Sequence, residues 1–333
     1  MTKPIKIGVI GLGRIGKVHC ENLVYRIPEA DVTAVMTPNQ SKSDYVRQLS
    51  ISKFSENADD IFENENIEAV IICSPTPSHF EYIEKAAKSG KHIFCEKPLD
   101  MTVSKIEEAL EIVKNYGVKL QIGFQKRFDS NYFQVRKQVL NGKIGEPHIL
   151  RITSRDPAPP PIEYIKSSGG LFMDMTIHDF DMARFIVGSE VTEVFAKGAV
   201  LVDENIGKAG DIDTGVVILK FENGCLGIIE NSRKAVYGYD QRLEIFGSEG
   251  MSQIGNVYPN TEMLYDKNGR HTGQPLDFFM TRYTVAYCEQ MRAFVKAIQN
   301  KEEVTVSAKD ALAATQIALA ANESLEKNSP VTL

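Results

Sequence analysis

Short apolar runs alternate with amphipathic stretches over the first part of the chain. Ile5–Ile10 and Ala69–Cys73 are almost entirely apolar and end at turn residues, which is typical of strands buried on both faces of a sheet. Phe80–Ser89 instead carries apolar residues at helical spacing and ends at Gly90, which favours a helix. Strands that alternate with helices predict an α/β fold with a parallel, doubly wound sheet. Further strands are predicted at Val32–Met36, His92–Cys95 and Lys119–Gly123, and further helices at Lys17–Tyr25 and Thr102–Tyr116.

The pattern changes after about Phe124. Val216–Phe221 and Cys225–Asn231 are strand-like runs that flank Asn223-Gly224, a strong signal for a two-residue hairpin. Helices are predicted at Asn131–Asn141, Tyr283–Asn300 and Ala308–Glu326. The chain is therefore expected to form two domains: residues 1–123 with the doubly wound sheet, and residues 124–333 as an α+β domain with a large, mostly antiparallel or mixed sheet.

Composition limits the classes of function. The 333 residues include 38 Lys and Arg and 44 Asp and Glu, and a net charge of −6 disfavours a nucleic-acid binder. No run approaches the ~18 apolar residues of a membrane helix, and no signal peptide is evident, so no membrane partner is expected. The five cysteines are scattered without paired spacing, which indicates neither a disulfide framework nor a zinc site. A cytoplasmic protein is expected.

A glycine motif follows the first predicted strand and opens the first predicted helix. In Gly11-Leu12-Gly13-Arg14-Ile15-Gly16 the glycines allow a tight turn, close approach of a pyrophosphate and close packing of helix on strand. The helix N-terminus would hold the phosphates through its free N–H groups. This order of strand, glycines and helix predicts a dinucleotide-binding Rossmann domain; the alternative is a purely structural glycine turn.

The second predicted strand ends without the acidic residue that would bind the adenosine ribose hydroxyls. Thr37 follows Val35-Met36 at this place. A carboxylate would repel the 2′-phosphate of NADP, so its absence removes a contact for NAD and a clash for NADP. We expect NAD as the cofactor, with NADP possible.

Polar residues follow the next two predicted strands, at the edge of the sheet where ligands bind in open α/β folds. Ser74, Thr76 and His79 come after Ala69–Cys73 and are candidates for contacts to the cofactor, although a plain strand-to-helix turn is an equal alternative for each. Glu96 and Lys97 come after His92–Cys95 and are further cofactor candidates. Lys97 would lie close to the nicotinamide, where its charge could hold a substrate hydroxyl; the alternative is a surface lysine.

The richest polar stretch of the second domain contains Asp174, His178 and Asp181. If the segment is an α-helix, Asp174 and His178 are one turn apart on one face. A carboxylate beside an imidazole orients the ring and stabilises its cation, which suits a general base near neutral pH. The alternatives are a capping aspartate with a buried structural histidine, or a metal site; no second histidine or cysteine supports the metal, and none is predicted.

These residues together resemble the Gfo/Idh/MocA oxidoreductase family over essentially the full length. The resemblance rests on the glycine motif, His19, Glu96-Lys97-Pro98, residues 123–128 and Asp174-x-x-x-His178-Asp179. Within the family the chain most resembles inositol 2-dehydrogenases, through residues 154–157, 169–181 and 237–240.

The resemblance implies that Lys97, Asp174 and His178 act together in oxidation of myo-inositol to a keto-inositol by hydride transfer to NAD(P). It implies substrate contacts that also include Arg127, Arg155, Asp156 and Tyr237. The alternatives are a scyllo-inositol, polyol or sugar dehydrogenase of the same family, or a non-catalytic nucleotide sensor. It further implies a homo-oligomer, a dimer or tetramer assembled through the open sheet of the second domain.

Overall fold

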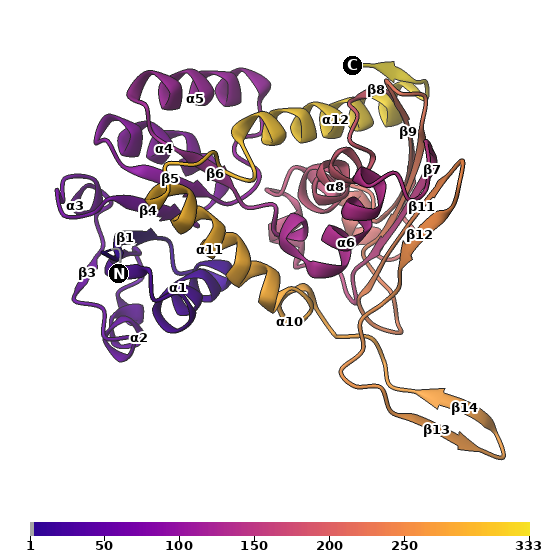
Figure 1. Cartoon of the computed structure of the whole chain (residues 1–333), viewed down its shortest axis with the longest axis horizontal. Coiled ribbons are helices and arrows are strands. Elements are labelled where there is room, and N and C mark those ends of the chain that lie inside the picture. The colour runs from indigo at the N-terminus through magenta and orange to yellow at the C-terminus, as the bar shows by residue number, and fades with distance from the viewer. Residues whose placement is uncertain (1–2) are drawn as a thin grey trace. The chain divides into compact units, whose positions relative to one another are not determined.

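The computed structural model describes residues 3–333 of the chain, which form two compact units (Figure 1). Unit 1 comprises the residues up to Phe128 together with Val285–Ala313. Unit 2 comprises Asp129–Thr284 and Ala314–Leu333. The long helix α12 (Ala308–Lys327) therefore begins in unit 1 and ends in unit 2.

Unit 1 contains a six-stranded sheet in the order β3-β2-β1-β4-β5-β6, and every pairing in it is parallel. This order reverses direction beside β1, which is the arrangement of a doubly wound nucleotide-binding sheet. The predicted parallel sheet is confirmed. Its strands are β1 (Ile5–Ile10), β2 (Ala30–Met36), β3 (Lys53–Ser55), β4 (Ala69–Ile72), β5 (His92–Cys95) and β6 (Leu120–Ile122).

Helices connect the strands of unit 1. The helix α5 ends at Gly117, whose φ of 65° is the left-handed conformation that stops a helix at low cost when the residue is glycine. The helices are α1 (Arg14–Arg26), α2 (Ser43–Gln48), α3 (Asp59–Phe62), α4 (His79–Lys88), α5 (Val103–Tyr116) and α11 (Thr284–Gln299), with 3₁₀ turns at Gln40–Lys42, Thr76–Ser78 and Gln125–Phe128.

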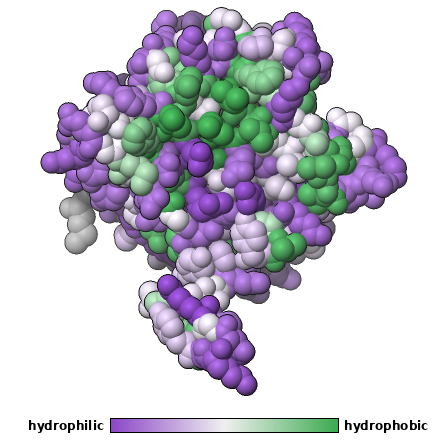
Figure 2. All heavy atoms as spheres, turned by 90° about the vertical axis from the view of Figure 1, so that its right-hand side faces the viewer, coloured by the Kyte–Doolittle hydropathy of each residue, from purple (hydrophilic) through white to green (hydrophobic). Residues whose placement is uncertain are grey.

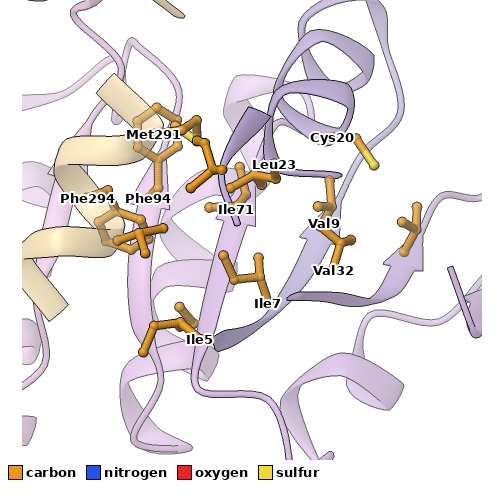
Figure 3. Packing of buried hydrophobic residues seen from close by; sticks show 14 of the residues in the cluster. Ile5, Ile7, Val9, Cys20, Leu23, Val32, Ile71, Phe94, Met291 and Phe294 are labelled. Atoms are coloured by element: carbon orange, nitrogen blue, oxygen red, sulfur yellow. The ribbon is translucent and has the colours of Figure 1, made fainter. Parts of the chain in front are cut away.

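The core on one face of this sheet combines segments from both ends of the sequence. Ile7 and Ile71 of the strands pack with Leu23 of α1, while Met291 and Phe294 come from α11 (Figure 3). All five side chains are completely buried, and each such burial contributes about 1.5–3 kcal/mol. The helix α11 is therefore an integral part of the dinucleotide-type unit although it follows most of unit 2 in the chain.

Unit 2 contains a seven-stranded sheet in the order β12-β11-β7-β10-β9-β8-β15. β7 and β10 pair in parallel and the other neighbours are antiparallel, so the predicted mixed sheet is confirmed. The hairpin between β9 and β10 turns at Asn223-Gly224, where Gly224 has a φ of 87°. The strands are β7 (Pro147–Arg155), β8 (Val191–Ala199), β9 (Thr214–Phe221), β10 (Leu226–Ser232), β11 (Asp240–Gly247), β12 (Met251–Ile254) and β15 (Val331–Thr332).

Helices α6 (Ser130–Leu140) and α8 (Ile177–Val187) pack against each other and against strands of this sheet. The opposite face carries exposed apolar side chains, and Figure 2 shows a green, apolar area there. A separate hairpin of β13 (Met263–Asp266) and β14 (Gly269–Thr272) projects beyond the large sheet (Figure 1). The short helices are α7 (Ile162–Ile165), α9 (Glu204–Lys208) and α10 (Phe279–Arg282). Among residues 3–333, no helix combines the length and apolar character needed to cross a membrane.

Candidate active site

The glycine motif forms the turn between β1 and α1. Gly11 has a φ of 94°, and a Cβ on it would lie 2.8 Å from the backbone of Cys73. A Cβ on Gly16 would lie 2.0 Å from the carbonyl oxygen of Gly11. Gly13 differs, because a Cβ there would meet no other atom of residues 3–333 within 4 Å. Two glycines are thus required by packing, while the third leaves open space at the N-terminus of α1, which fits the pyrophosphate of a dinucleotide.

Thr37 lies directly beyond β2, next to the glycine turn. The N–H of Gly11 donates to the carbonyl of Met36, and the N–H of Thr37 donates to the carbonyl of Ser55. The Thr37 side chain is buried, and its hydroxyl accepts a long, 3.5 Å hydrogen bond from the N–H of Asn39. The position that would face the adenosine ribose therefore carries a hydroxyl group in place of a carboxylate.

The predicted cofactor residues after β4 and β5 lie at one edge of the sheet, as parallel neighbours require. Ser74 and Ser78 are joined by their hydroxyls at 2.7 Å, and Thr76 begins the 3₁₀ turn that leads into α4. His79 is buried and its ring contacts two backbone carbonyls, those of Ser74 and Pro98. The carboxylate of Glu96 accepts a hydrogen bond from a ring nitrogen of His19 on α1, at 2.6 Å.

Lys97 follows Glu96 at the end of β5, and its peptide bond to Pro98 is cis. Arg127, a predicted substrate contact, is buried in unit 1, and its guanidinium pairs with the carboxylate of Asp310 at 2.9 Å. Burial raises the pKa of Asp310, but the charge of Arg127 and hydrogen bonds from Ser307 outweigh it and leave the pKa below its ordinary value. Arg127 thus has a structural partner within its own unit.

The segment that carries Asp174 and His178 is not one continuous α-helix. Phe172–Thr176 is a π-helical turn, and α8 begins only at Ile177. Asp174 therefore lies in the π turn and His178 in the first turn of α8, so the single α-helix for which their common face was predicted is interrupted between them. Such single π turns are frequent at functional sites.

A buried arginine holds Asp174. The Nη1 atom of Arg233 lies 3.3 Å from Oδ2 of Asp174, and its Nη2 atom lies 3.3 Å from Oδ2 of Asp211. The side chain of Arg233 is only 1% exposed. The hydroxyl of Tyr164 donates to the other oxygen of Asp174 at 2.8 Å. Both oxygens of Asp174 are thus fixed by named partners.

Asp211 links this network to the start of the π turn. Its Oδ1 atom accepts the N–H of Leu171 at 3.0 Å. A Cβ on Gly170 would lie 2.9 Å from the same oxygen, and Gly170 has a φ of 82°. Gly169 and Gly170 both adopt positive φ, which favours glycine, and Gly170 also lies against the Asp211 carboxylate.

The other predicted substrate contacts of unit 2 gather at one end of its large sheet. In the pairing of β7 with β10, Arg155 lies opposite Ser232, and the N–H of Asp156 donates to the carbonyl of Ser232. Arg233, which pairs with Asp174, directly follows Ser232 in the chain. Asp156 therefore lies beside the end of β10 that leads into Arg233.

Arg155 and Tyr237 are joined directly. Arg155 donates to the Tyr237 hydroxyl at 2.7 Å, and this hydroxyl donates to Oδ2 of Asp240 at 2.6 Å. Burial and the bond to Asp240 raise the pKa of Tyr237. The buried Asp240 keeps a pKa below its ordinary value, because hydrogen bonds from Arg242, Tyr237 and Asn256 outweigh the effect of burial. A pocket of about 400 Å³ lies here, lined by Tyr237, Asp240, Arg242, Asn256, Tyr258, Thr272, Gly273, Gln274 and Pro275.

Sequence reasoning missed Arg233 and Tyr164, which fix Asp174, and Asp211, which holds Arg233. Arg233, Tyr164 and Asp211 stand 59, 10 and 37 positions from Asp174 in the sequence, and no periodicity or motif joins them. The one sequence feature that could have pointed to Arg233 is its place just after the predicted strand Cys225–Asn231. In the sequence His19 stands out only as part of the family resemblance, whereas the structure shows its hydrogen bond to Glu96.

The chain matches two family models. Residues 5–124 match the model described as "Oxidoreductase family, NAD-binding Rossmann fold". Residues 132–253 match the model of the GFO/IDH/MocA C-terminal domain.

Individual proteins are similar over their whole length. "Myo-inositol 2-dehydrogenase" of Thermotoga maritima is 48% identical over 99% of this chain and 98% of that protein. "Inositol 2-dehydrogenase" of Rhizobium meliloti is 43% identical over 99% of each. The crystal structure of scyllo-inositol dehydrogenase from Lactobacillus casei with bound NAD(H) and scyllo-inositol superposes with a TM-score of 0.93 at 34% identity, covering 99% of each chain.

The parallel sheet, the glycine turn and these matches define an NAD-binding Rossmann oxidoreductase with a mixed-sheet second unit. The chain belongs to the GFO/IDH/MocA family. The predictions of family, fold class and cofactor are confirmed.

Proposed function

We propose that the protein is an inositol 2-dehydrogenase that oxidises myo-inositol to a keto-inositol with NAD⁺. The full-length similarity to the dehydrogenase of Thermotoga maritima carries this proposal. The retention of Lys97, Asp174 and His178 supports it, because a protein that only senses nucleotides does not need a proton-transfer set. NADP remains the second cofactor to test, since Thr37 offers no carboxylate to repel a 2′-phosphate.

When bound, NAD⁺ supplies the acceptor for the hydride that leaves the substrate carbon. His178 takes the proton of the reacting hydroxyl. Its Nδ1 atom is buried, so we assign the transfer to Nε2. Lys97 stabilises the negative charge that develops on the oxygen as the proton leaves. The C–H and O–H bonds break, a C=O bond forms, and the proton and hydride leave on different carriers.

Asp174 holds substrate hydroxyls in position. Its carboxylate can serve this purpose because Tyr164 and Arg233 fix both of its oxygens. Asp156, Arg155 and Tyr237 are the remaining candidate contacts in unit 2, and Arg127 is the candidate in unit 1. A neutral polyol offers no charge, so its recognition must rest on the pattern of hydrogen bonds.

The second candidate substrate is scyllo-inositol, because a scyllo-inositol dehydrogenase of Lactobacillus casei shares the fold at 34% identity. The two inositols differ in the orientation of one hydroxyl group, so the same residues could serve either. Another polyol or sugar would be oxidised by the same chemistry.

We also propose that the protein acts in the cytoplasm as a homo-oligomer, a dimer or tetramer that buries the open face of the large sheet. Exposed apolar side chains support this assembly, since contiguous apolar patches mark association surfaces. They belong to adjacent strands of the sheet: Ile149, Val216, Ile218, Leu226, Phe246 and Met251. Light scattering after size exclusion should give twice or four times the chain mass, and Ile218→Lys should lower it; a wild-type monomer would contradict the proposal.

The function is tested by the absorbance of the reduced nicotinamide. Purified protein is incubated with NAD⁺ or NADP⁺ and with myo-inositol, scyllo-inositol, chiro-inositol or glucose. We expect reduction with NAD⁺ and myo-inositol. Reduction with scyllo-inositol alone would support the second candidate, and cofactor binding without any reduction would support the nucleotide sensor.

A further inference from the structure

Two buried histidines hold the segment that carries Lys97, one on each side of it. His19 of α1 contacts Glu96, the residue before Lys97, and His79 of α4 contacts the carbonyl of Pro98, the residue after it. Both contacts lie within unit 1. Neither histidine has a part in the proposed chemistry.

The contact between His19 and Glu96 is short and shielded from solvent. The Nε2 atom of His19 lies 2.6 Å from Oε1 of Glu96, and the exposed fractions of the two side chains are 0% and 12%. The rings of Phe94 and Tyr287 pack edge-on against the imidazole. The Nδ1 atom is buried without a partner among the described residues, so a hydrogen on Nε2 is the arrangement that leaves no N–H unpaired.

The carboxylate of Glu96 is enclosed on another side by the backbone. A Cβ on Gly123 would lie 2.8–2.9 Å from the Glu96 carboxylate, and the N–H of Gly123 donates to the carbonyl of Cys95. The negative charge of Glu96 also contributes, after burial, to the raised pKa of the Cys73 and Cys95 thiols. Glu96 therefore occupies a closed site, which makes it a fixed anchor for the residue that follows.

His79 holds the residue that follows Lys97, namely Pro98. Its Nδ1 atom lies 2.9 Å from the carbonyl oxygen of Pro98, and its Nε2 atom lies 2.8 Å from that of Ser74. The side chain is 1% exposed. Because Ser74 follows β4 and Pro98 follows β5, this ring connects the two loops at the ligand-binding edge of the sheet.

We propose that His19 and His79 are positioning residues that fix Lys97 for hydride transfer by holding Glu96 and Pro98. This inference rests on the proposed function of Lys97. A catalytic group must be held within about 0.5 Å of its productive position, and a long lysine side chain on a loop needs such support from its neighbours.

The test compares substitutions that remove or keep the hydrogen-bonding atom. His19→Leu removes it, whereas His19→Gln keeps an N–H near the position of Nε2. His79→Leu tests the second support. His92→Leu is the matched control, because His92 lies on β5 itself but at its other end, where Nδ1 accepts the N–H of Lys119 at 3.1 Å.

We expect His19→Leu and His79→Leu to lower kcat about 10- to 100-fold, since small misplacements of reacting groups have effects of this size. The KM for inositol and the Kd for NAD⁺ should change less than about 3-fold, and His19→Gln should recover most of the loss. His92→Leu should keep kcat near the wild-type value. Equal losses in His92→Leu, or a wild-type kcat in His19→Leu, would overturn the proposal.

A second measurement does not depend on the substrate. Hydrogen exchange of the cofactor-free protein should be faster in the peptide Cys95–Asp100 in His19→Leu than in wild type, and unchanged there in His92→Leu. If exchange of this peptide is unchanged in His19→Leu, His19 does not hold the segment that carries Lys97. If wild type oxidises no inositol while the exchange result holds, the proposed function fails and the structural support stands.

Discussion

The two units hold their own candidate functional residues in place with different chemical groups. Unit 1 relies largely on its backbone: a glycine turn with open space at Gly13, and two loop carbonyls that the ring of His79 contacts. Unit 2 uses buried charges: Asp174 depends on Arg233, and Arg233 depends in turn on Asp211. A backbone site tolerates many side chains provided that its glycines stay, whereas a charge network fails when one member is removed. This difference can be tested separately in each unit.

The largest effect is expected in unit 2, at His178. His178→Ala removes the proposed base, and kcat should fall about 10²- to 10⁴-fold. Because the cofactor is assigned to the backbone of unit 1, the Kd for NAD⁺ should change less than about 3-fold. Steady-state kinetics with myo-inositol and fluorescence titration with NADH check the two halves of the prediction. Near-normal turnover would remove His178 from its assigned role.

The second prediction separates two glycines of unit 1. Gly13 has φ −67° and ψ −168°, a conformation open to any residue, and its missing side chain leaves empty space. Gly13→Val should therefore fold with an unchanged Tm but lose at least 10-fold in affinity for NAD⁺, by filling the space proposed for the pyrophosphate.

Gly16→Val is the matched control, because its Cβ would lie 2.0 Å from the Gly11 carbonyl. This variant should lose stability even without cofactor, which thermal unfolding measures. Normal NAD⁺ binding by Gly13→Val would show that the pyrophosphate lies elsewhere.

The third prediction concerns the charge network. Arg233→Met leaves the carboxylates of Asp174 and Asp211 without their shared cation in a mostly buried place. The free energy of unfolding should fall by about 3 kcal/mol, as when one partner of a buried ion pair is removed. kcat should fall as well, because Asp174 loses one of its two supports.

Arg233→Lys should rescue only part of this loss, since one ammonium cannot repeat two separate guanidinium contacts. Lys166→Met removes an exposed ion pair with Glu163 and should change stability by less than about 1 kcal/mol. Equal effects of Arg233→Met and Lys166→Met in urea unfolding would contradict a special role of the network.

The same difference between the units explains what the sequence could predict. The parallel sheet and the glycine turn follow from local patterns, since buried strands are short apolar runs and the turn needs glycine at fixed spacing. Arg233 cannot be found in this way, because 59 residues separate it from Asp174 and only the folded sheet brings them together. The sequence pattern also predicts an ordinary helix at Phe172–Thr176, where the structure has a π turn whose two ends bond to distant residues, Leu171 to Asp211 and Thr176 to Asn231.

His19 and Glu96 show that unit 1 has hidden side-chain contacts too. They are 77 residues apart, and each belongs to a motif whose spacing gives no sign of the other. The motifs predicted which loops reach the ligand-binding edge of the sheet. They did not predict which polar atoms in those loops are occupied by contacts within the protein.

The smallest effect is the response of the two units to acid. Burial lowers the pKa of His79, although hydrogen bonds to Pro98 and Ser74 and the charges of Glu96 and Asp100 oppose it. In the unfolded chain the histidine takes up a proton below about pH 6.5, while the native ring resists protonation until a lower pH. The unfolded state then binds more protons, so unit 1 should lose stability as the pH falls below about 6.5.

The carboxylates of unit 2 should respond later. Asp240 has a lowered pKa, because its hydrogen bonds outweigh burial, so its stabilisation persists until the pH falls below about 4. Hydrogen exchange between pH 7.5 and 5 should therefore accelerate in the strands of unit 1 before those of unit 2. His79→Gln should weaken this dependence in unit 1, where burial also lowers the pKa of His92, and should leave unit 2 unchanged. If both units loosen together, or if His79→Gln keeps the wild-type slope, the buried histidine is not the group that makes unit 1 sensitive to acid.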